Sequence, residues 1–340
     1  MNLITGATGI VGAHVALQLL QQHQSVVAIK RSNSDIQKTK KLFSYYTADY
    51  EVLFQKIKWV DGDVTDIYSI IEALDGISKV YHCAGFVSFN NKQREQLFKI
   101  NGEGTANVVN ACLEKNVATL CHVSSIATLQ NPDVTQSIDE SVFWKSSPQA
   151  SNYAISKYNG EREVWRGIEE GLNAVIVNPG AIITPGFLEQ SSGKIIQTCY
   201  NGNLFYTNGG TGYIAASDVA KCMIHLVNEK QFGQRFVLVE SNHSYQDILT
   251  QIHIALSKKP PTIKANKQLL ILAAWIEKIR CFFTQKEPLI TQQIIPALIE
   301  KNTYKAEKIK QSIPFKLTPI EQYVKFVCQV FLDEQLSKKG

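Results

Sequence analysis

Short runs of apolar and β-branched residues alternate with longer stretches of helical periodicity along residues 1–240. An extended run at residues 2–4 leads through glycines into a largely apolar helix expected over Ile10 to Gln21. This alternation predicts an α/β fold, in which a parallel sheet carries helices on both faces and binds ligands beyond the carboxyl ends of its strands. Further strands are expected at Val26–Ile29, Ile57–Val60, Lys79–Cys83, Thr119–Val123, Ala174–Val177 and Arg235–Val239, with long helices at Arg94–Lys115 and Asn152–Glu170.

The pattern changes after Gly180. Two segments rich in glycine and polar residues, 186–194 and 200–213, are expected to form loops over a site. From Pro260 to Pro296 the sequence is helical and amphipathic, without a strand signal. We therefore expect a large α/β domain over residues 1–180, to which residues 214–240 return. A small, mostly helical lobe would comprise residues 181–213 and 241–335.

Composition narrows the classes of function. The chain has 340 residues, 44% of them hydrophobic, and a net charge of only +5, with no basic run of the kind that binds nucleic acid. The seven cysteines are scattered and never form a C-x-x-C pair, which disfavours disulfides and structural zinc and favours a reducing, cytoplasmic location. The apolar run LLILAAWI at residues 269–276 is too short to span a bilayer.

The opening sequence MNLITGATGIVG places Gly6, Gly9 and Gly12 between the first strand and the first helix. Glycine permits positive φ there and lets a ligand approach the backbone. The first N–H groups of the helix have no partner within the helix, so a pyrophosphate could bind to them. A tight turn that only packs the helix on the strand is the alternative.

The ends of the second and third expected strands carry polar side chains. Lys30, Arg31 and Ser32 stand where a dinucleotide fold reads the adenosine ribose, and basic residues there accommodate a 2′-phosphate. NADP(H) is therefore favoured, with NAD(H) as the alternative, unless these cations are simply solvated. Asp63 could accept a hydrogen bond from an adenine amino group, or it could cap the helix that begins near Asp66.

Tyr153 and Lys157 are four residues apart within an expected helix, which places both on one face. A nearby ammonium group stabilises a phenolate and lowers the pKa of the tyrosine, which makes it usable as an acid or base near neutrality. An ordinary surface pair is the alternative. Ser124 and Ser125 end an apparently buried strand and could equally be turn formers.

These motifs follow one another in a characteristic order: the glycine turn, the basic strand end, Asp-Val, HCAG, NGEGT, SS, YAISK and NPG. In this order the sequence resembles the extended short-chain dehydrogenase/reductases over residues 1–240, nearest the branch of dihydroflavonol-4-reductase and 3β-hydroxysteroid dehydrogenase. The resemblance implies a Rossmann-type, doubly wound domain with a C-terminal lobe that binds substrate. It also implies an NADP(H)-dependent reductase or dehydrogenase acting on a ketone, aldehyde or secondary alcohol of a mainly apolar small molecule.

The resemblance also implies roles for matching positions. Tyr153 would exchange a proton with the substrate, and Lys157 would bind the nicotinamide ribose and lower the pKa of Tyr153. Ser125 would hold the substrate carbonyl, and Asn101 would support a proton relay unless it is only structural. The implied cofactor-binding set is Gly6, Thr8, Gly9, Ile10, Val11, Gly12, Lys30, Arg31, Ser32, Asp63, Val64, Cys83, Ala84, Gly85, Val123, Tyr153, Lys157, Asn178, Pro179 and Gly180.

Two other functions remain open. A nucleotide-sugar epimerase or dehydratase with tightly held NAD is disfavoured, because V-Y-G does not follow the serines and Asn178 replaces the usual arginine. A non-catalytic dinucleotide sensor is disfavoured by the presence of Tyr153 and Lys157.

The remaining features have plain interpretations. No metal site is expected, since His82 and His122 are better explained as hydrogen-bonded core residues. A homodimer through helices 94–115 and 152–170 is the association that the resemblance implies. The helix over residues 268–283 is expected to cap the substrate pocket with its apolar face, and membrane contact is the disfavoured alternative.

Overall fold

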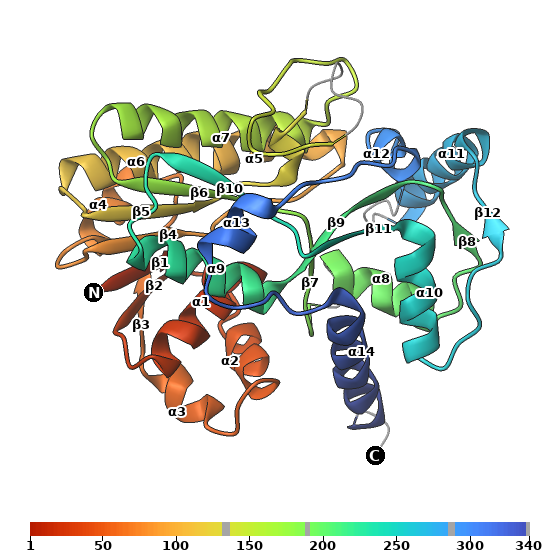
Figure 1. Ribbon diagram of the computed structural model, residues 1–340, viewed down its shortest axis with the longest axis horizontal. Coiled ribbons are helices and arrows are strands. Elements are labelled where there is room, and N and C mark those ends of the chain that lie inside the picture. Colours follow the sequence, from red (N-terminus) through yellow and green to blue (C-terminus); the bar gives the residue numbers. More distant parts are fainter. Residues whose placement is uncertain (131–136, 188–190, 285–289, 338–340) are drawn as a thin grey trace.

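The computed structural model describes residues 1–130, 137–187, 191–284 and 290–337. A seven-stranded, all-parallel sheet forms the centre of the larger part, with the strand order β10-β6-β5-β4-β1-β2-β3 (Figure 1). This confirms the predicted α/β class, and every predicted strand is present. The strands are β1 Asn2–Thr5, β2 Val26–Lys30, β3 Ile57–Asp61, β4 Lys79–His82, β5 Thr119–Val123, β6 Ala174–Pro179 and β10 Gln234–Leu238.

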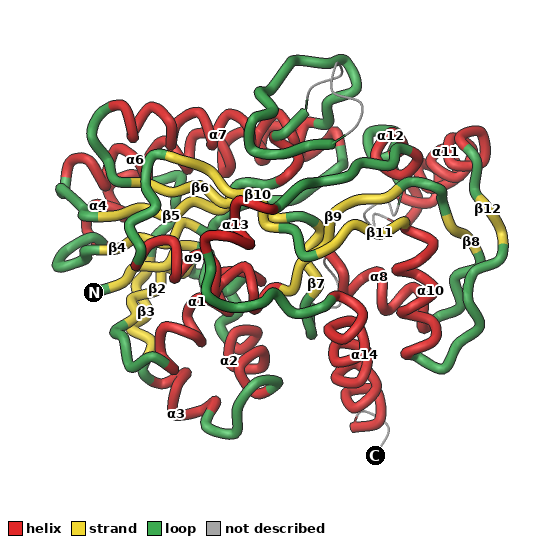
Figure 2. Tube along the Cα trace, viewed as in Figure 1, coloured by secondary structure: helices red, strands yellow, loops and turns green. Residues whose placement is uncertain are grey.

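Helices cover both faces of this sheet (Figure 2). Neighbouring residues of a strand point to opposite faces, so Ile4 joins one apolar core and Leu3 the other. The first core contains α1 (Ile10–Gln21) and α9 (Ala216–Asn228). The second contains α4 (Ile67–Ala73), α6 (Gly104–Glu114) and α7 (Asn152–Glu169). Strands buried on both faces consist of nearly continuous apolar residues, which is why the sequence revealed them.

The strand order reverses between β1 and β4, which are neighbours although β2 and β3 separate them in sequence. At such a switch point the connections after the two strands run to opposite sides, which leaves a crevice at their carboxyl ends. The glycine turn follows β1, and the HCAG motif begins at the end of β4. The fold therefore brings these two motifs to the edge at which open α/β sheets bind ligands.

The smaller part is mostly helical, as predicted. It contains a three-stranded sheet of β7 (Ala181–Ile183), β9 (Gly210–Ala215) and β11 (Ser241–Ser244), and a two-stranded sheet of β8 (Phe205–Tyr206) and β12 (Ile263–Lys264). In Figure 1 most of this part lies to the right of the main sheet. Its helices are α8 Ser191–Tyr200, α10 Tyr245–Ala255, α11 Lys267–Thr284, α12 Ile295–Ile299 and α14 Ile320–Ser337, whereas α13 Glu307–Ser312 packs on the main domain.

Two expectations about this part were wrong. The segments read as loops contain α8, β8 and β9, and the supposedly strand-free segment 260–296 contains β12. The glycines of β9 serve close packing. A Cβ on Gly180 would lie 2.4 Å from the carbonyl oxygen of Gly212, and a Cβ on Gly212 would lie 2.5 Å from the side chain of Val239. The glycine-rich composition therefore reflects backbone contact within a sheet.

The domain boundaries remain a prediction, and the packing shows where the two parts meet. After α12 the chain returns to the main domain, where Ile309 and Ile313 join the same core as α1 and α9. Farther along, the hydroxyl groups of Tyr46 and Tyr323 lie 2.6 Å apart, which joins α14 to the region after α2 (Gln37–Ser44).

Candidate active site

The glycine turn forms a closely packed cradle at the start of α1. Gly6 has φ +69°, and a Cβ added there would lie 2.6 Å from the backbone nitrogen of Ala84. A Cβ on Gly12 would lie 2.4 Å from the carbonyl oxygen of Gly6. Gly9 is the N-cap residue, and no side chain caps the helix. The uncapped N–H groups fit a diphosphate, beside half-buried Thr8 and Ile10 and buried Val11.

The basic residues at the end of β2 differ in their surroundings. Lys30 forms an ion pair with Asp61 of β3. The exposed guanidinium of Arg31 has no hydrogen-bond or ion-pair partner among the described residues, while its backbone N–H donates to Ser34. Ser32 is exposed as well. Arg31 is therefore the cation best placed to meet an incoming anion.

The Asp63 carboxylate closes a local turn. Its Oδ1 accepts bonds from the backbone N–H and the hydroxyl of Thr65, both at 2.9 Å. The N-cap of α4 is Asp66, so the alternative that Asp63 caps this helix is wrong. The buried side chain of Val64 packs against Gly104. A Cβ added to Gly104 would lie 2.8 Å from the Val64 side chain. The second carboxylate oxygen of Asp63 accepts no hydrogen bond from the described residues.

A buried hydrogen-bond chain runs from the HCAG segment to the long helical region. Thr105 donates to the carbonyl of Asn101 at 2.7 Å, so its hydroxyl oxygen accepts from Nε2 of His82 at 3.0 Å. Nδ1 of His82 then accepts from the hydroxyl of Thr5 at 2.7 Å, and that oxygen accepts from the N–H of Ala84 at 3.2 Å. Burial lowers the pKa of His82 to about 3, so the ring stays neutral and the chain keeps one direction.

Asn101 lies in a π-helical turn, Lys99–Glu103, between α5 (Arg94–Phe98) and α6. The prediction of one regular helix over 94–115 is therefore corrected. The side chain accepts from the Phe86 N–H at 2.7 Å and donates to the Phe86 carbonyl at 2.8 Å and to the Ser156 hydroxyl at 2.9 Å. A Cβ on Gly160 would lie 2.2 Å from the Asn101 carbonyl oxygen, so α7 packs directly on this turn. π-Turns are frequent at functional sites.

Tyr153, Ser125 and Lys157 meet at the amino-terminal part of α7. Burial raises the pKa of Tyr153, and its hydrogen bond with the Ser125 hydroxyl acts in the opposite direction. The Nζ of Lys157 donates to the Val123 carbonyl at 2.6 Å, and burial lowers the pKa of Lys157 to about 8. We expected Lys157 to lower the pKa of Tyr153. In the structure the effect of burial is larger, so the pKa of Tyr153 is raised and the phenol stays protonated.

The two halves of the site are close together. A Cβ on Gly85 would lie 3.4 Å from the side-chain oxygen of Asn101 and 3.7 Å from Nζ of Lys157. Gly6 in turn contacts the backbone of Cys83 and Ala84. The fold therefore brings the glycine cradle, the segment after β4 and the YAISK helix to one edge of the sheet.

Glu161 is a buried carboxylate that the motif analysis missed. It is 2% exposed, and its Oε2 accepts from Ser124 at 2.6 Å, Thr128 at 2.8 Å and Asn178 at 2.9 Å. Its Oε1 accepts from the guanidinium of Arg235 at 2.9 Å. The amide nitrogen of Asn178 is therefore bonded within this cluster, while its buried Oδ1 has no hydrogen-bond partner among the described residues, and Pro179 and Gly180 continue the buried strand end.

The spacing of Glu161 could have revealed it. It follows Lys157 by four residues, as Lys157 follows Tyr153, so all three lie along one side of α7. Its negative charge raises the pKa of Lys157, against the larger effect of burial.

His122 departs from its expected role. It is fully buried, but neither ring nitrogen has a hydrogen-bond partner among the described residues, unlike His82. The two ring centroids lie 5.1 Å apart. Burial holds the pKa of His122 well below its usual value, so the ring is neutral. Within the described ranges, no group of three or more His, Cys, Asp or Glu side chains is placed to hold a metal ion.

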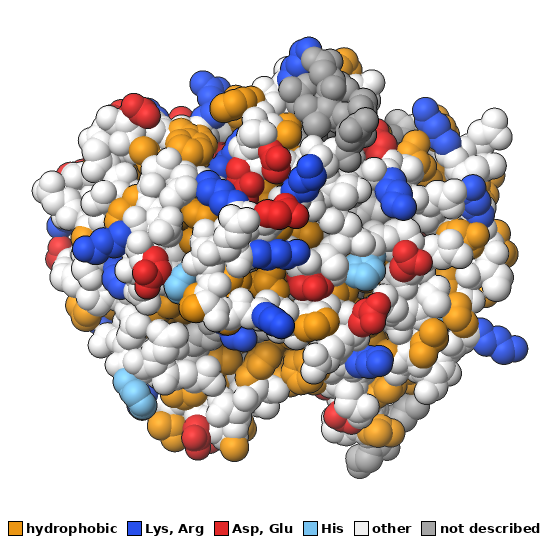
Figure 3. Space-filling view, viewed as in Figure 1, with side chains coloured by type: hydrophobic (Ala, Val, Ile, Leu, Met, Phe, Trp, Pro, Cys, Tyr) orange, Lys and Arg blue, Asp and Glu red, His pale blue; other side chains and the backbone are white. Residues whose placement is uncertain are grey.

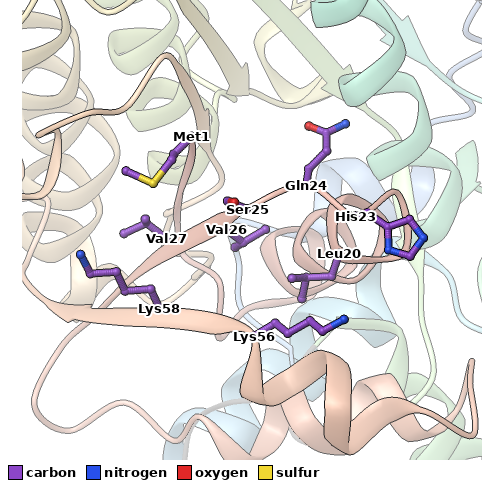
Figure 4. Close-up of a pocket in the computed structure, with 9 residues that line it drawn as sticks. All are labelled: Met1, Leu20, His23, Gln24, Ser25, Val26, Val27, Lys56 and Lys58. Atoms are coloured by element: carbon purple, nitrogen blue, oxygen red, sulfur yellow. The ribbon is translucent and has the colours of Figure 1, made fainter.

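A surface pocket of about 390 Å³ lies at the opposite edge of the sheet (Figure 4). Ser25, Val26 and Lys56 line it together with Met1, at the amino ends of β1, β2 and β3. The pocket is therefore remote from the carboxyl ends, where the cradle and Tyr153 lie.

Comparison with known proteins agrees with this geometry. Residues 2–238 match the model of the NAD dependent epimerase/dehydratase family, and the chain belongs to that family. A putative dihydroflavonol 4-reductase of Synechocystis is 27% identical over 328 residues, which cover 94% of this chain and 91% of the relative. Sterol demethylase protein B of Methylococcus capsulatus is 26% identical and covers 84% of each chain.

Solved structures share the fold over nearly the whole chain. The crystal structure of gox2253 aligns with a TM-score of 0.79 at 25% identity and covers 98% of each chain. The Bordetella bronchiseptica enzyme WbmH in complex with NAD⁺ aligns with a TM-score of 0.73 at 16% identity, a likeness that shows the fold alone. The chain is thus an extended short-chain dehydrogenase/reductase with an NAD(P)-binding Rossmann fold.

Proposed function

We propose that the chain is an NADP(H)-dependent reductase of a ketone or aldehyde on a mainly apolar substrate, with Tyr153 as the acid. The observation that carries this proposal is the hydrogen bond between Tyr153 and Ser125, with Lys157 one helical turn farther along α7 and its Nζ beside Gly85 at the carboxyl edge of the sheet. The glycine cradle, which a Cβ would fill, fits the diphosphate of the cofactor.

Bound NADPH would supply the hydride that adds to the carbonyl carbon. As the carbon–oxygen π electrons move to the oxygen, the Tyr153 hydroxyl transfers its proton to that oxygen and becomes a phenolate. The Ser125 hydroxyl donates a hydrogen bond to the same oxygen, and the Lys157 ammonium stabilises the phenolate until it is reprotonated. Burial raises the pKa of Tyr153, so the side chain holds its proton before the reaction, and proton transfer would rely on the Lys157 ammonium to stabilise the phenolate.

Cofactor choice rests on Arg31. Its guanidinium is exposed and without a partner among the described residues, whereas Lys30 is paired with Asp61. A 2′-phosphate would give Arg31 a charge-assisted bidentate contact. The free carboxylate oxygen of Asp63 would accept from the adenine amino group.

The substrate class is inferred from relatives named for flavonol and sterol chemistry, which favour an apolar, ring-bearing molecule. All seven cysteines are free, which supports a reducing, cytoplasmic compartment.

The test is a panel of cyclic and aromatic ketones and aldehydes, followed by the loss of NADPH absorbance. Turnover of at least one carbonyl compound with net NADPH oxidation supports the proposal. The contrary result has two parts: the purified protein releases stoichiometric NAD when it is denatured, and it converts a nucleotide sugar without net consumption of cofactor. That result would replace the proposed reductase function with an epimerase or dehydratase function.

A further inference from the structure

Helix α11 buries only a narrow side against its own lobe. Leu270 is 4% exposed and Ala274 is 7% exposed, and both pack on Ile295 of α12. Six large apolar residues of the helix instead face solvent. They are Leu269, Ile271, Leu272, Trp275, Ile276 and Ile279, with exposed fractions of 36–58%.

This exposed face is centred on two residues. Leu272 and Ile279 are seven residues apart, two helical turns, on the side opposite Leu270 and Ala274. The two residues that flank Ile279 in sequence are Lys278 and Arg280, which at about 100° per residue fall on the two margins of the face. Such an apolar face with basic margins is typical of helices that lie in a membrane interface.

The chain around α11 is strongly basic. Lys258, Lys259, Lys264 and Lys267 are all exposed, and Glu277 is the only acidic residue from 254 to 281. Figure 3 shows apolar and basic side chains mixed along the edge of the molecule formed by α10, β8 and β12. Large exposed apolar residues continue along this edge, at Ile254 of α10, Phe205 of β8, Ile263 of β12 and Leu204, which directly precedes β8.

We propose that α11 and the neighbouring β8–β12 sheet dock the protein on a membrane with anionic headgroups. The helix would lie parallel to the surface, with Leu272 and Ile279 at the boundary between headgroups and acyl chains. Trp275 carries the ammonium of Lys278 over its ring at 5.3 Å, an amphipathic pair suited to that depth. Association would be peripheral, since no helix among the described residues is long and apolar enough to cross a membrane.

Charge separates this proposal from contact with a second copy of the chain. A two-fold contact through α11 would bring the lysines of one copy towards those of the other, at a cost in free energy. Interface cores between proteins are also depleted of lysine. An anionic lipid surface complements the same lysines, at a contribution of about 1 kcal/mol for each basic side chain near the surface.

The experiment is flotation with vesicles of phosphatidylcholine, alone or mixed with phosphatidylglycerol. We expect the protein to float with the anionic vesicles and the emission of Trp275 to shift to shorter wavelength, with Trp275→Phe identifying the signal. The double variant Leu272→Ser, Ile279→Ser should lower the partition coefficient on the order of tenfold, because both residues lose the apolar surface that would enter the lipid. The double variant Lys264→Glu, Lys267→Glu should weaken binding to the anionic vesicles and leave binding to pure phosphatidylcholine vesicles unchanged.

The matched control is Val52→Ser, which changes another apolar residue, 56% exposed, on α3 (Tyr50–Gln55), far from α11 in Figure 1. It should bind vesicles as the parent does. Retained NADPH affinity shows that each variant is folded. Failure to float, or flotation that the α11 double variant does not weaken, would overturn the proposal. So would a dimer in sedimentation velocity that the double variant dissociates, because a second copy would then cover the face.

Discussion

The ammonium of Lys157 donates a 2.6 Å hydrogen bond to the carbonyl oxygen of Val123, the last residue of β5. This bond holds the side chain beside Gly85, at the carboxyl edge of the sheet. The same position is buried, and a buried ammonium releases its proton more readily than one in water.

The affinity for NADPH should therefore depend on pH through Lys157. Burial lowers its pKa to about 8, so the side chain is charged below that pH and neutral above it. We expect the dissociation constant to be flat up to about pH 8 and to rise above it, as the cation that would hold the ribose is lost. Fluorescence titration across this range measures it. Lys157→Met should bind weakly at every pH, and an unchanged rise in that variant would assign the effect elsewhere.

Arg31 should decide between the two cofactors. Arg31→Asp removes a charge-assisted contact and adds repulsion, which should weaken NADPH binding on the order of ten- to a hundredfold and reverse the preference. Lys30→Ala is the matched control and should have a smaller effect, because Lys30 is already paired with Asp61. Calorimetric titration with NADPH and NADH compares the variants. Equal effects at both positions would show that Arg31 has no special role.

Two glycines, Gly102 within the π-turn and Gly160 packed against it, should respond in opposite ways to alanine. In Gly160→Ala the new Cβ would lie 2.2 Å from the carbonyl oxygen of Asn101, so α7 must move away from that turn. We expect loss of stability on the order of 1–3 kcal/mol and a lower kcat, since Tyr153 lies on the same helix. In Gly102→Ala the nearest atom is 3.6 Å away, so the change should be neutral or slightly stabilising. Urea unfolding with parallel kinetics distinguishes them.

Glu161 and Arg235 should depend on each other. Arg235→Met leaves a buried carboxylate without its cation, which typically costs about 3–5 kcal/mol. Adding Glu161→Leu removes that charge, but it leaves Ser124, Thr128 and Asn178 without their acceptor. The double variant should therefore recover only part of the loss in urea unfolding. Additive losses would show that the pair is not coupled.

The sequence predicted the features that depend on local pattern. Buried parallel strands such as β6 appear in the sequence as runs of apolar residues, and the glycines at 6, 9 and 12 indicated the turn before α1. The π-turn at Asn101 could not be predicted, because the residue packed against it, Gly160, belongs to another helix far along the sequence. The glycines of β9 led to the wrong prediction of a loop, because glycine is favoured both in flexible loops and where two backbones pack closely. Which side of α11 is covered follows from α12, which lies beyond it in sequence.

The central claim is that Tyr153 donates the proton, and the variant Tyr153→Phe tests it most directly. Hydride transfer from NADPH to an active carbonyl substrate would be followed by stopped-flow absorbance, with NADPH affinity measured by fluorescence titration. The change removes one hydroxyl group and leaves the phosphate cradle intact. We therefore expect kcat to fall by at least about a hundredfold while the dissociation constant of NADPH changes little. A variant that turns over near the parent rate would contradict the claim and leave Tyr153 a packing residue against Phe89.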